Sequence, residues 1–229
     1  MAKQAKRKKI GHLECIEVLG EESGPTVVLF HGYGADMMDL ASLSQAVQAP
    51  KTTNWYFPNG HLAVPIGPHH EGRAWFPISL SELERGGNID LSTVVPPGLK
   101  RARENALEFI KKLGVAPEKL VLGGFSQGAM LATDVMLHME KPPAGLALLS
   151  TTLVNFETWS TLAKKHPGFR FFQSHGARDQ VLSFALAQRM ETVLKEAGWV
   201  GQLQRFEGGH EIPFDVLIQL GAFLRKVTA

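Results

Sequence analysis

A serine between two glycines is the first residue whose setting suggests chemistry. Ser126 lies in Gly-Phe-Ser-Gln-Gly, residues 124–128, which matches the pattern Gly-x-Ser-x-Gly. The apolar run 120–122 before it is typical of a strand, and the run 129–132 after it favours a helix. A serine on so sharp a turn is held beyond the strand end, where helix N–H groups can stabilise a developing anion. The plain alternative is a strand–turn–helix connection in which the serine only caps the helix.

Two further polar residues follow predicted strands. Asp179 comes after the strand expected at 169–173, and His210 comes after the strand expected at 202–206. A histidine can take a serine proton near neutral pH, and a carboxylate on its other nitrogen fixes the tautomer. Each residue also has a plain reading, Asp179 as a turn cap and His210 as a partner of the final helix. The order serine–acid–histidine is that of α/β-hydrolases, so the joint placement favours a catalytic triad.

Two other carboxylates compete for the role of the acid. Asp134 and Asp215 both fall within predicted helices rather than after strands. A site at strand ends is therefore expected to use Asp179 instead.

The hydrophobic pattern predicts the elements that must position these side chains. Strands are expected at 12–19, 26–30, 54–58, 120–122, 144–149, 169–173 and 202–206, and helices at 38–47, 98–113, from the serine turn to about 139, 184–197 and 212–227. Alternating strands and helices predict an α/β fold with a mostly parallel sheet and helices on both faces. Ligands bind at the carboxyl ends of the strands in such sheets, where the three candidate residues are expected.

Length and composition predict one globular domain over residues 1–229, with 44% hydrophobic and 20% charged residues. Residues 1–10 are basic but lack aromatic residues and an amphipathic pattern, so we expect a flexible, solvated tail rather than a nucleic-acid site. Residues 60–97 are rich in proline and glycine and too long for an ordinary connection. We expect this segment to be an excursion over the active site.

Several function classes are disfavoured. No run approaches the roughly 20 apolar residues of a membrane helix, and the basic start is not followed by the apolar region of a secretory signal. A cytoplasmic protein is therefore expected. Cys15 is the single cysteine and predicts a buried structural thiol. The pair His69 and His70 has no carboxylate or cysteine at ligand spacing, so no metal site is expected.

Four motifs together resemble the phospholipase/carboxylesterase family, which includes the acyl-protein thioesterases. They are Phe-His-Gly-Tyr-Gly-Ala-Asp at 30–36, Gly-Phe-Ser-Gln-Gly-Ala at 124–129, His-Gly-Ala-Arg-Asp at 175–179 and Gly-Gly-His-Glu-Ile at 208–212. The resemblance extends from Thr26 to the C-terminus. It implies an α/β-hydrolase fold, with the nucleophile, acid and base at Ser126, Asp179 and His210.

The same resemblance implies further site residues. The oxyanion-hole amides fall on Tyr33 and Gln127, and the pocket motif that binds substrate falls on Trp75 and Phe76. His31 precedes the oxyanion-hole loop and is expected to hold it through hydrogen bonds rather than act as the base.

The chain also departs from the family pattern. Residues 180–183, Gln-Val-Leu-Ser, replace the usual Val-Val-Pro after the acid, and tyrosine stands at position 33 where leucine is common. The excursion also looks longer than in many members. These differences leave the acyl specificity open.

The residues and the resemblance together predict a serine hydrolase of carboxylic esters that works through an acyl-enzyme. Its expected substrate is a small-molecule ester, with no cofactor or metal and with a monomer or homodimer as the assembly. An acyl thioesterase or lysophospholipase is the nearest alternative and would need a long apolar channel. A peptidase is disfavoured because nothing identifies a site for a peptide terminus. A non-catalytic binding protein on this fold is expected to lack a triad member.

Overall fold

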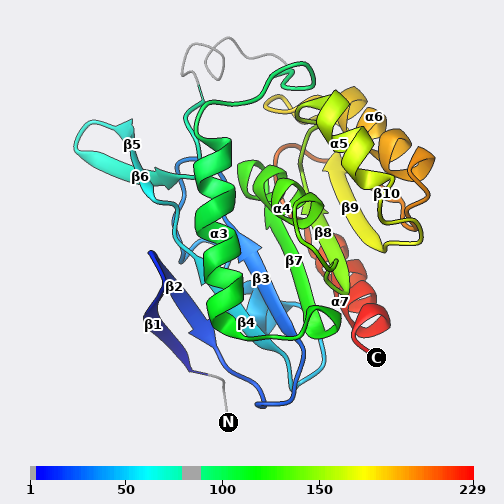
Figure 1. Cartoon of the computed structure of the whole chain (residues 1–229). Coiled ribbons are helices and arrows are strands. Elements are labelled where there is room, and N and C mark those ends of the chain that lie inside the picture. The colour runs from blue at the N-terminus through cyan, green and yellow to red at the C-terminus, as the bar shows by residue number, and fades with distance from the viewer. Residues whose placement is uncertain (1–3, 79–88) are drawn as a thin grey trace.

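The computed structural model describes residues 4–78 and 89–229 (Figure 1). Within these ranges an eight-stranded sheet has the order β1-β2-β4-β3-β7-β8-β9-β10. Its strands are β1 Ala5–Ile10, β2 Leu13–Val18, β3 Thr26–Phe30, β4 Asn54–Pro58, β7 Leu120–Phe125, β8 Gly145–Leu149, β9 Phe171–Gly176 and β10 Leu203–Phe206. From β4 to β10 all neighbours are parallel, while β2 runs antiparallel to β1 and β4. The predicted mostly parallel sheet is confirmed.

Helices cover both faces of this sheet. They are α1 Leu43–Ala46, α3 Leu99–Leu113, α4 Gln127–Leu137, α5 Phe156–Ala163, α6 Phe184–Glu196 and α7 Phe214–Val227, with a 3₁₀ turn η1 at Pro117–Lys119. Successive strand residues point to opposite faces. Val28 packs in the core under α3 to α6, whereas Val27 packs with α1 and α7. In the described part of the chain, no helix combines the length and apolar character needed to cross a membrane.

The N-terminal segment corrects one expectation. Residues 5–10, which we expected to belong to a flexible tail, form β1 and pair antiparallel with β2. Lys8 forms a 3.1 Å ion pair with Glu17, whose side chain is largely buried. A run of basic residues predicts exposure to solvent, and we took that exposure to indicate a tail. Exposed lysines are also typical of a strand at the edge of a sheet. The other strand predictions locate their strands to within a few residues.

One helix prediction differs from the structure, and one helix was missed. The helix expected at 38–47 shrinks to α1, because the preceding residues form successive turns with hydrogen bonds such as Ala41 N–H to Met38 O at 3.2 Å. Helix α5 was not predicted. Its signal was present, since Phe156 and Trp159 are three residues apart and both pack on the core.

The excursion expected at 60–97 begins with a hairpin. β5 Leu62–Gly67 and β6 His70–Ala74 pair antiparallel and project from the side of the molecule (Figure 1, cyan). Backbone bonds of 2.8 Å from Gly34 N–H to Arg73 O, and from Arg73 N–H to Ala35 O, bind the hairpin to the loop after β3. The part of the excursion at 79–88 lies outside the described residues.

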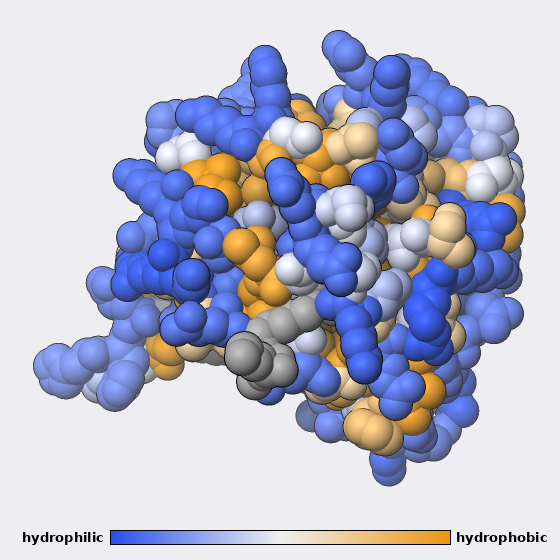
Figure 2. All heavy atoms as spheres, turned by 90° about the horizontal axis from the view of Figure 1, so that it is seen from below, coloured by the Kyte–Doolittle hydropathy of each residue, from blue (hydrophilic) through white to orange (hydrophobic). Residues whose placement is uncertain are grey.

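Two other features bear on the core and the surface. Cys15 is fully buried, and burial raises the pKa of its thiol to about 12, so the predicted buried structural thiol is confirmed. Seen from below, at the amino ends of the parallel strands, the surface is mostly hydrophilic with separated hydrophobic patches (Figure 2).

The junction of β7 and α4 depends on a glycine. A Cβ placed on Gly128 would overlap the backbone carbonyl oxygens of Phe30 and His31 at the end of β3. Backbone atoms cannot move aside as a flexible side chain can. The helix can therefore begin this close to the sheet only when residue 128 has no side chain.

We predict that Gly128→Ala lowers the free energy of unfolding by about 2 kcal/mol or more, because the added methyl overpacks against backbone. The change is measured by urea denaturation. Gly67→Ala is the matched control, since a Cβ there meets nothing within 4 Å. Equal stability losses in the two variants would contradict the role given to Gly128.

Candidate active site

Ser126 occupies a strained turn between β7 and α4. Its φ is 54° and its ψ −121°, a conformation that costs a residue other than glycine about 1–3 kcal/mol. The Ser126 N–H donates to Leu149 O at 2.8 Å and so ties the turn to the end of β8. Its side chain makes no capping hydrogen bond to α4, which argues against the alternative of a serine present only as a helix cap.

Asp179 and His210 meet at the ends of neighbouring strands. Nδ1 of His210 donates to Oδ2 of Asp179 at 2.7 Å, although 31 residues separate them. The two loops are joined by backbone as well, since Arg178 N–H donates to Gly208 O at 2.9 Å. The Asp179 side chain is fully inaccessible and that of His210 is 18% exposed. This arrangement fixes the imidazole and leaves its outer edge accessible.

The carboxylate of Asp179 is held by several donors. Burial alone would raise the pKa of Asp179, but hydrogen bonds from His175, His210 and the Leu182 N–H outweigh burial and hold that pKa well below its usual range. Oδ1 accepts the N–H groups of Val181 and Leu182 at 2.8 and 2.9 Å. Asp179 therefore carries its charge throughout the neutral range and can stabilise a protonated imidazole beside it.

Ser126 and His210 line the same cavity, which has a volume of about 360 Å³. The ring of Phe125 lies 4.8 Å from that of His210 and forms part of the wall. The other lining residues are Gly32, Tyr33, Ala35, Asp39, Ile78, Ile89, Met130, Val181 and Leu182. Two of the three residues predicted from their order in the sequence thus line one mostly apolar cavity, and the third, Asp179, is buried behind His210.

Both predicted oxyanion-hole residues border this site. Gln127 is the first residue of α4, so its N–H has no partner within the helix. Tyr33 lines the cavity, and its N–H makes no hydrogen bond to another residue in the described ranges. Two backbone donors without partners beside Ser126 form an arrangement that can receive a negative oxygen.

His31 holds the loop that carries Tyr33. Its Nε2 accepts the Gly60 N–H at 2.9 Å, so Nδ1 carries the proton and donates to Gly32 O at 2.7 Å. Burial lowers the pKa of His31 to about 4. The expectation that His31 supports this loop through hydrogen bonds is confirmed.

Trp75 and Phe76, to which the resemblance assigns contact with substrate, have different surroundings. Both are fully buried, and neither lines the cavity beside Ser126. Trp75 Nε1 donates to His31 O at 2.8 Å, and its ring packs edge-on against Phe30. For Trp75 the predicted contact with substrate is therefore corrected to packing behind the loop that carries Tyr33. Phe76 lines an apolar groove next to the cavity, so its contact with substrate stays a prediction. Trp75 was read as a pocket wall because it stands in an aromatic loop, whereas its side chain is fully buried.

Sequence reasoning missed the role of the Gln127 side chain. It is fully buried, and it accepts the Trp75 N–H at 2.9 Å while donating to Phe76 O at 2.7 Å. The side chain therefore fastens the aromatic segment to the start of α4. No local motif reveals this contact, because its partners lie about fifty residues away.

A second missed residue is His175. Its fully buried imidazole places Nε2 3.2 Å from Oδ2 of Asp179, the oxygen that also accepts from His210. The motif His-Gly-Ala-Arg-Asp contains this residue and could have drawn attention to it.

The competing carboxylates have other surroundings. Asp134 in α4 pairs with Arg103 of α3 at 2.8 Å and accepts Trp159 Nε1 at 3.0 Å, which joins three helices. Asp215 lies in the first turn of α7. In the described part of the chain, no group of three or more His, Cys, Asp or Glu side chains is arranged to hold a metal ion.

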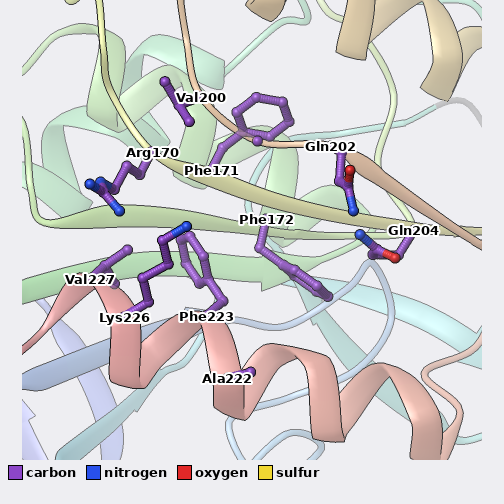
Figure 3. Close-up of a pocket in the computed structure, with 11 residues that line it drawn as sticks. Arg170, Phe171, Phe172, Val200, Gln202, Gln204, Ala222, Phe223, Lys226 and Val227 are labelled. Atoms are coloured by element: carbon purple, nitrogen blue, oxygen red, sulfur yellow. The ribbon is translucent and has the colours of Figure 1, made fainter.

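A larger cavity, of about 450 Å³, lies elsewhere (Figure 3). Its walls come from the starts of β9 and β10 and from the end of α7, where Lys226 lies beside Phe223. Ser126 and His210 lie after the opposite, carboxyl ends of the strands, and no serine, histidine or carboxylate lines this cavity. The smaller cavity is therefore the candidate active site.

Comparison with known proteins agrees with this geometry. A family model described as Phospholipase/Carboxylesterase matches residues 12–228. The chain is 26% identical over 225 residues to acyl-protein thioesterase 1 of Candida albicans, covering 91% of this chain and 94% of that protein. A probable carboxylesterase of Oryza sativa subsp. japonica is 28% identical, with 87% and 76% covered.

Solved structures show the same architecture. The crystal structure of esterase PE8 matches with a TM-score of 0.76 and 26% identity over 92% of this chain and 97% of that one. The predicted α/β-hydrolase fold is thereby confirmed.

The buried state of His31 predicts a pH dependence of stability. An unfolded chain binds a proton at this histidine near pH 6.5, whereas the folded chain does so only near pH 4. Between these values the unfolded state binds more protons, so lowering the pH lowers the free energy of unfolding. The free energy of unfolding of the unaltered chain falls as the pH is lowered from 6.5 to 4.5. In His31→Asn we expect this fall to be smaller by about 2 kcal/mol.

Urea denaturation at several pH values gives this difference. His70→Asn removes an exposed imidazole and is the matched control. A His31→Asn variant with the same pH slope as the unaltered chain would show that His31 does not contribute as inferred.

Proposed function

Because the chain belongs to the phospholipase/carboxylesterase family, we propose that it is a serine hydrolase of carboxylic esters that uses Ser126, His210 and Asp179. The observation that carries this proposal is the 2.7 Å hydrogen bond from His210 Nδ1 to Asp179 in a cavity that Ser126 also lines. A serine hydroxyl is a weak nucleophile and requires such a base.

In the first half of the reaction, Ser126 Oγ attacks the ester carbonyl carbon. Since Nδ1 of His210 carries a proton toward Asp179, its Nε2 has the free lone pair that accepts the serine proton. The carboxylate of Asp179 stabilises the imidazolium that forms. His210 then returns the proton to the leaving oxygen, the carbon–oxygen bond breaks, and an alcohol departs.

The carbonyl oxygen becomes negative during the attack. We assign its stabilisation to the N–H groups of Tyr33 and Gln127, which have no other partner among the described residues and border the same serine. One such donor is worth about 3 kcal/mol in the transition state, as judged by its removal. His31 and the hairpin β5–β6 keep the Tyr33 loop in place, so this donor is preorganised.

The second half of the reaction repeats these steps with water. His210 takes a proton from the water molecule, the resulting oxygen attacks the acyl group on Ser126, and the serine regains its proton. The products are a carboxylic acid and free enzyme, so no cofactor is required by this chemistry. We expect a small-molecule ester as substrate and a cytoplasmic, one-domain protein.

A second candidate function is an acyl thioesterase or lysophospholipase. An apolar groove of about 410 Å³ adjoins the active-site cavity, and Ile78 lines both. Val94, Val95 and Pro96 form part of its wall. An acyl chain bound to Ser126 could extend past Ile78 into this groove and bury its methylene groups there. The relatives named acyl-protein thioesterase agree with this alternative.

Replacing Ser126 with Ala is predicted to lower kcat for p-nitrophenyl acetate by about a million-fold, because triad members act as a unit. The fold should be unchanged, as checked by circular dichroism and urea denaturation. Near-parental turnover by a folded variant would refute the serine mechanism and favour a different function for this cavity.

The groove predicts the effect of acyl length. Val94→Asp should raise KM for p-nitrophenyl octanoate about tenfold or more, because the new carboxylate keeps several methylene groups of the octanoyl chain out of the groove. KM for p-nitrophenyl acetate should not change, because its acyl group is too short to reach the groove. Val200→Asp, at an exposed valine near the opposite strand ends, is the matched control. An equal effect on both esters would exclude the groove as an acyl site. The same series with thioesters separates the two candidate functions.

A further inference from the structure

His175 is a buried imidazole that the proposed reaction does not use. It lies in β9, four residues before Asp179, and its side chain is fully inaccessible. Nε2 lies 2.8 Å from Leu182 O and 3.2 Å from Oδ2 of Asp179. The second ring nitrogen, Nδ1, has no hydrogen-bond partner in the described ranges. A buried polar ring of this kind needs a reason to be there.

The partners of Nε2 identify where the ring proton is. A backbone carbonyl oxygen can only accept, so the Leu182 O requires a proton on Nε2. The same nitrogen lies 3.2 Å from Oδ2 of Asp179, whose carboxylate also only accepts. His175 is thus a donor shared between Asp179 and the loop that follows it.

Two imidazoles therefore lie against one carboxylate oxygen. Oδ2 of Asp179 receives His210 Nδ1 at 2.7 Å and lies 3.2 Å from His175 Nε2, while Oδ1 receives two backbone N–H groups. A carboxylate with more donors is less basic and holds a neighbouring cation less tightly. It is also fixed in rotation, because both oxygens have partners.

Resting on the proposed function, we propose that His175 is a positioning residue that aims Oδ2 of Asp179 at His210 and moderates the hold of this carboxylate on the imidazolium. His175 thereby sets the lower pH limit of activity. Without its N–H, Asp179 would bind the imidazolium more tightly, and His210 would become available as a base only at higher pH.

Other charged groups near these rings need to be considered. Arg205 on β10 pairs in register with His175, and its guanidinium lies 6.0 Å from the Phe184 ring that packs on His175. Asp39 lines the cavity with His210, and Glu211 follows His210 directly. None of these makes an ion pair with either imidazole in the described ranges, whereas Asp179 pairs with both.

Two variants of similar shape separate the N–H from packing. Gln places an amide N–H about as far from Cα as Nε2 of histidine, whereas Met has a similar length and no donor. The measurement is kcat/KM for p-nitrophenyl acetate between pH 5 and 9 in the unaltered chain and in both variants. His175→Met should move the acid limb to higher pH by about half a unit or more and lower the plateau about tenfold, and His175→Gln should restore both.

An acid limb at the same pH in His175→Met as in the unaltered chain would overturn the proposal. Equal shifts in the Met and Gln variants would also overturn it, because packing alone would then explain them. If His175→Met does not fold, nitrogen-15 spectra of the histidines in the unaltered chain test the tautomer directly. A proton on Nε2 of His175 is expected, and a proton on Nδ1 alone would contradict the inference.

The spectra also separate this inference from the proposed function. An unaltered chain that hydrolyses no ester at any pH would refute the proposed function. The tautomer of His175 would still be measured in the same sample, and it decides whether His175 donates to Asp179.

Discussion

The hydrogen bond from His210 Nδ1 to Asp179 Oδ2 is the contact on which the candidate site depends. It joins two loops that lie side by side only because β9 and β10 are parallel neighbours, paired from Leu203 and Gln173 onward. The backbone hydrogen bond from the Arg178 N–H to Gly208 O joins the same two loops a second time. A shift in the register of these strands would separate Asp179 from His210. The geometry of the site is therefore a consequence of the sheet.

Ser126, the proposed nucleophile, reaches the same place by another route. β7 lies near the middle of the sheet, and α4 begins so close to it that positions 124 and 128 must be glycine. This close approach, with the bond from the Ser126 N–H to β8, holds the serine in its strained conformation. The loop after β3 adds Tyr33, the proposed oxyanion donor. Four parallel strands thus deliver four parts of the site to one edge of the sheet.

Much of this arrangement could be predicted because it is local or follows from topology. Buried strands such as the one that contains Val27 to Phe30 are continuous apolar runs. The order of Ser126, Asp179 and His210 can be read directly from the sequence. The edge strand β1 escaped prediction because its basic residues are exposed, and exposure looks the same in a strand and in a tail. Trp75 was read as a pocket wall, but its burial depends on His31 and Phe30, which are distant in sequence. The contact of both imidazoles with Asp179 likewise depends on how β9 and the next loop fold together.

Covalent labelling tests the proposed nucleophile most directly. A fluorophosphonate reacts with a serine only when a base activates it and an oxyanion hole receives the phosphoryl oxygen. Intact mass and peptide mapping should show one adduct for each chain, on Ser126, with labelling abolished in Ser126→Ala and strongly slowed in His210→Ala. No adduct on Ser126, or undiminished labelling of another residue in Ser126→Ala, would contradict the account of this site.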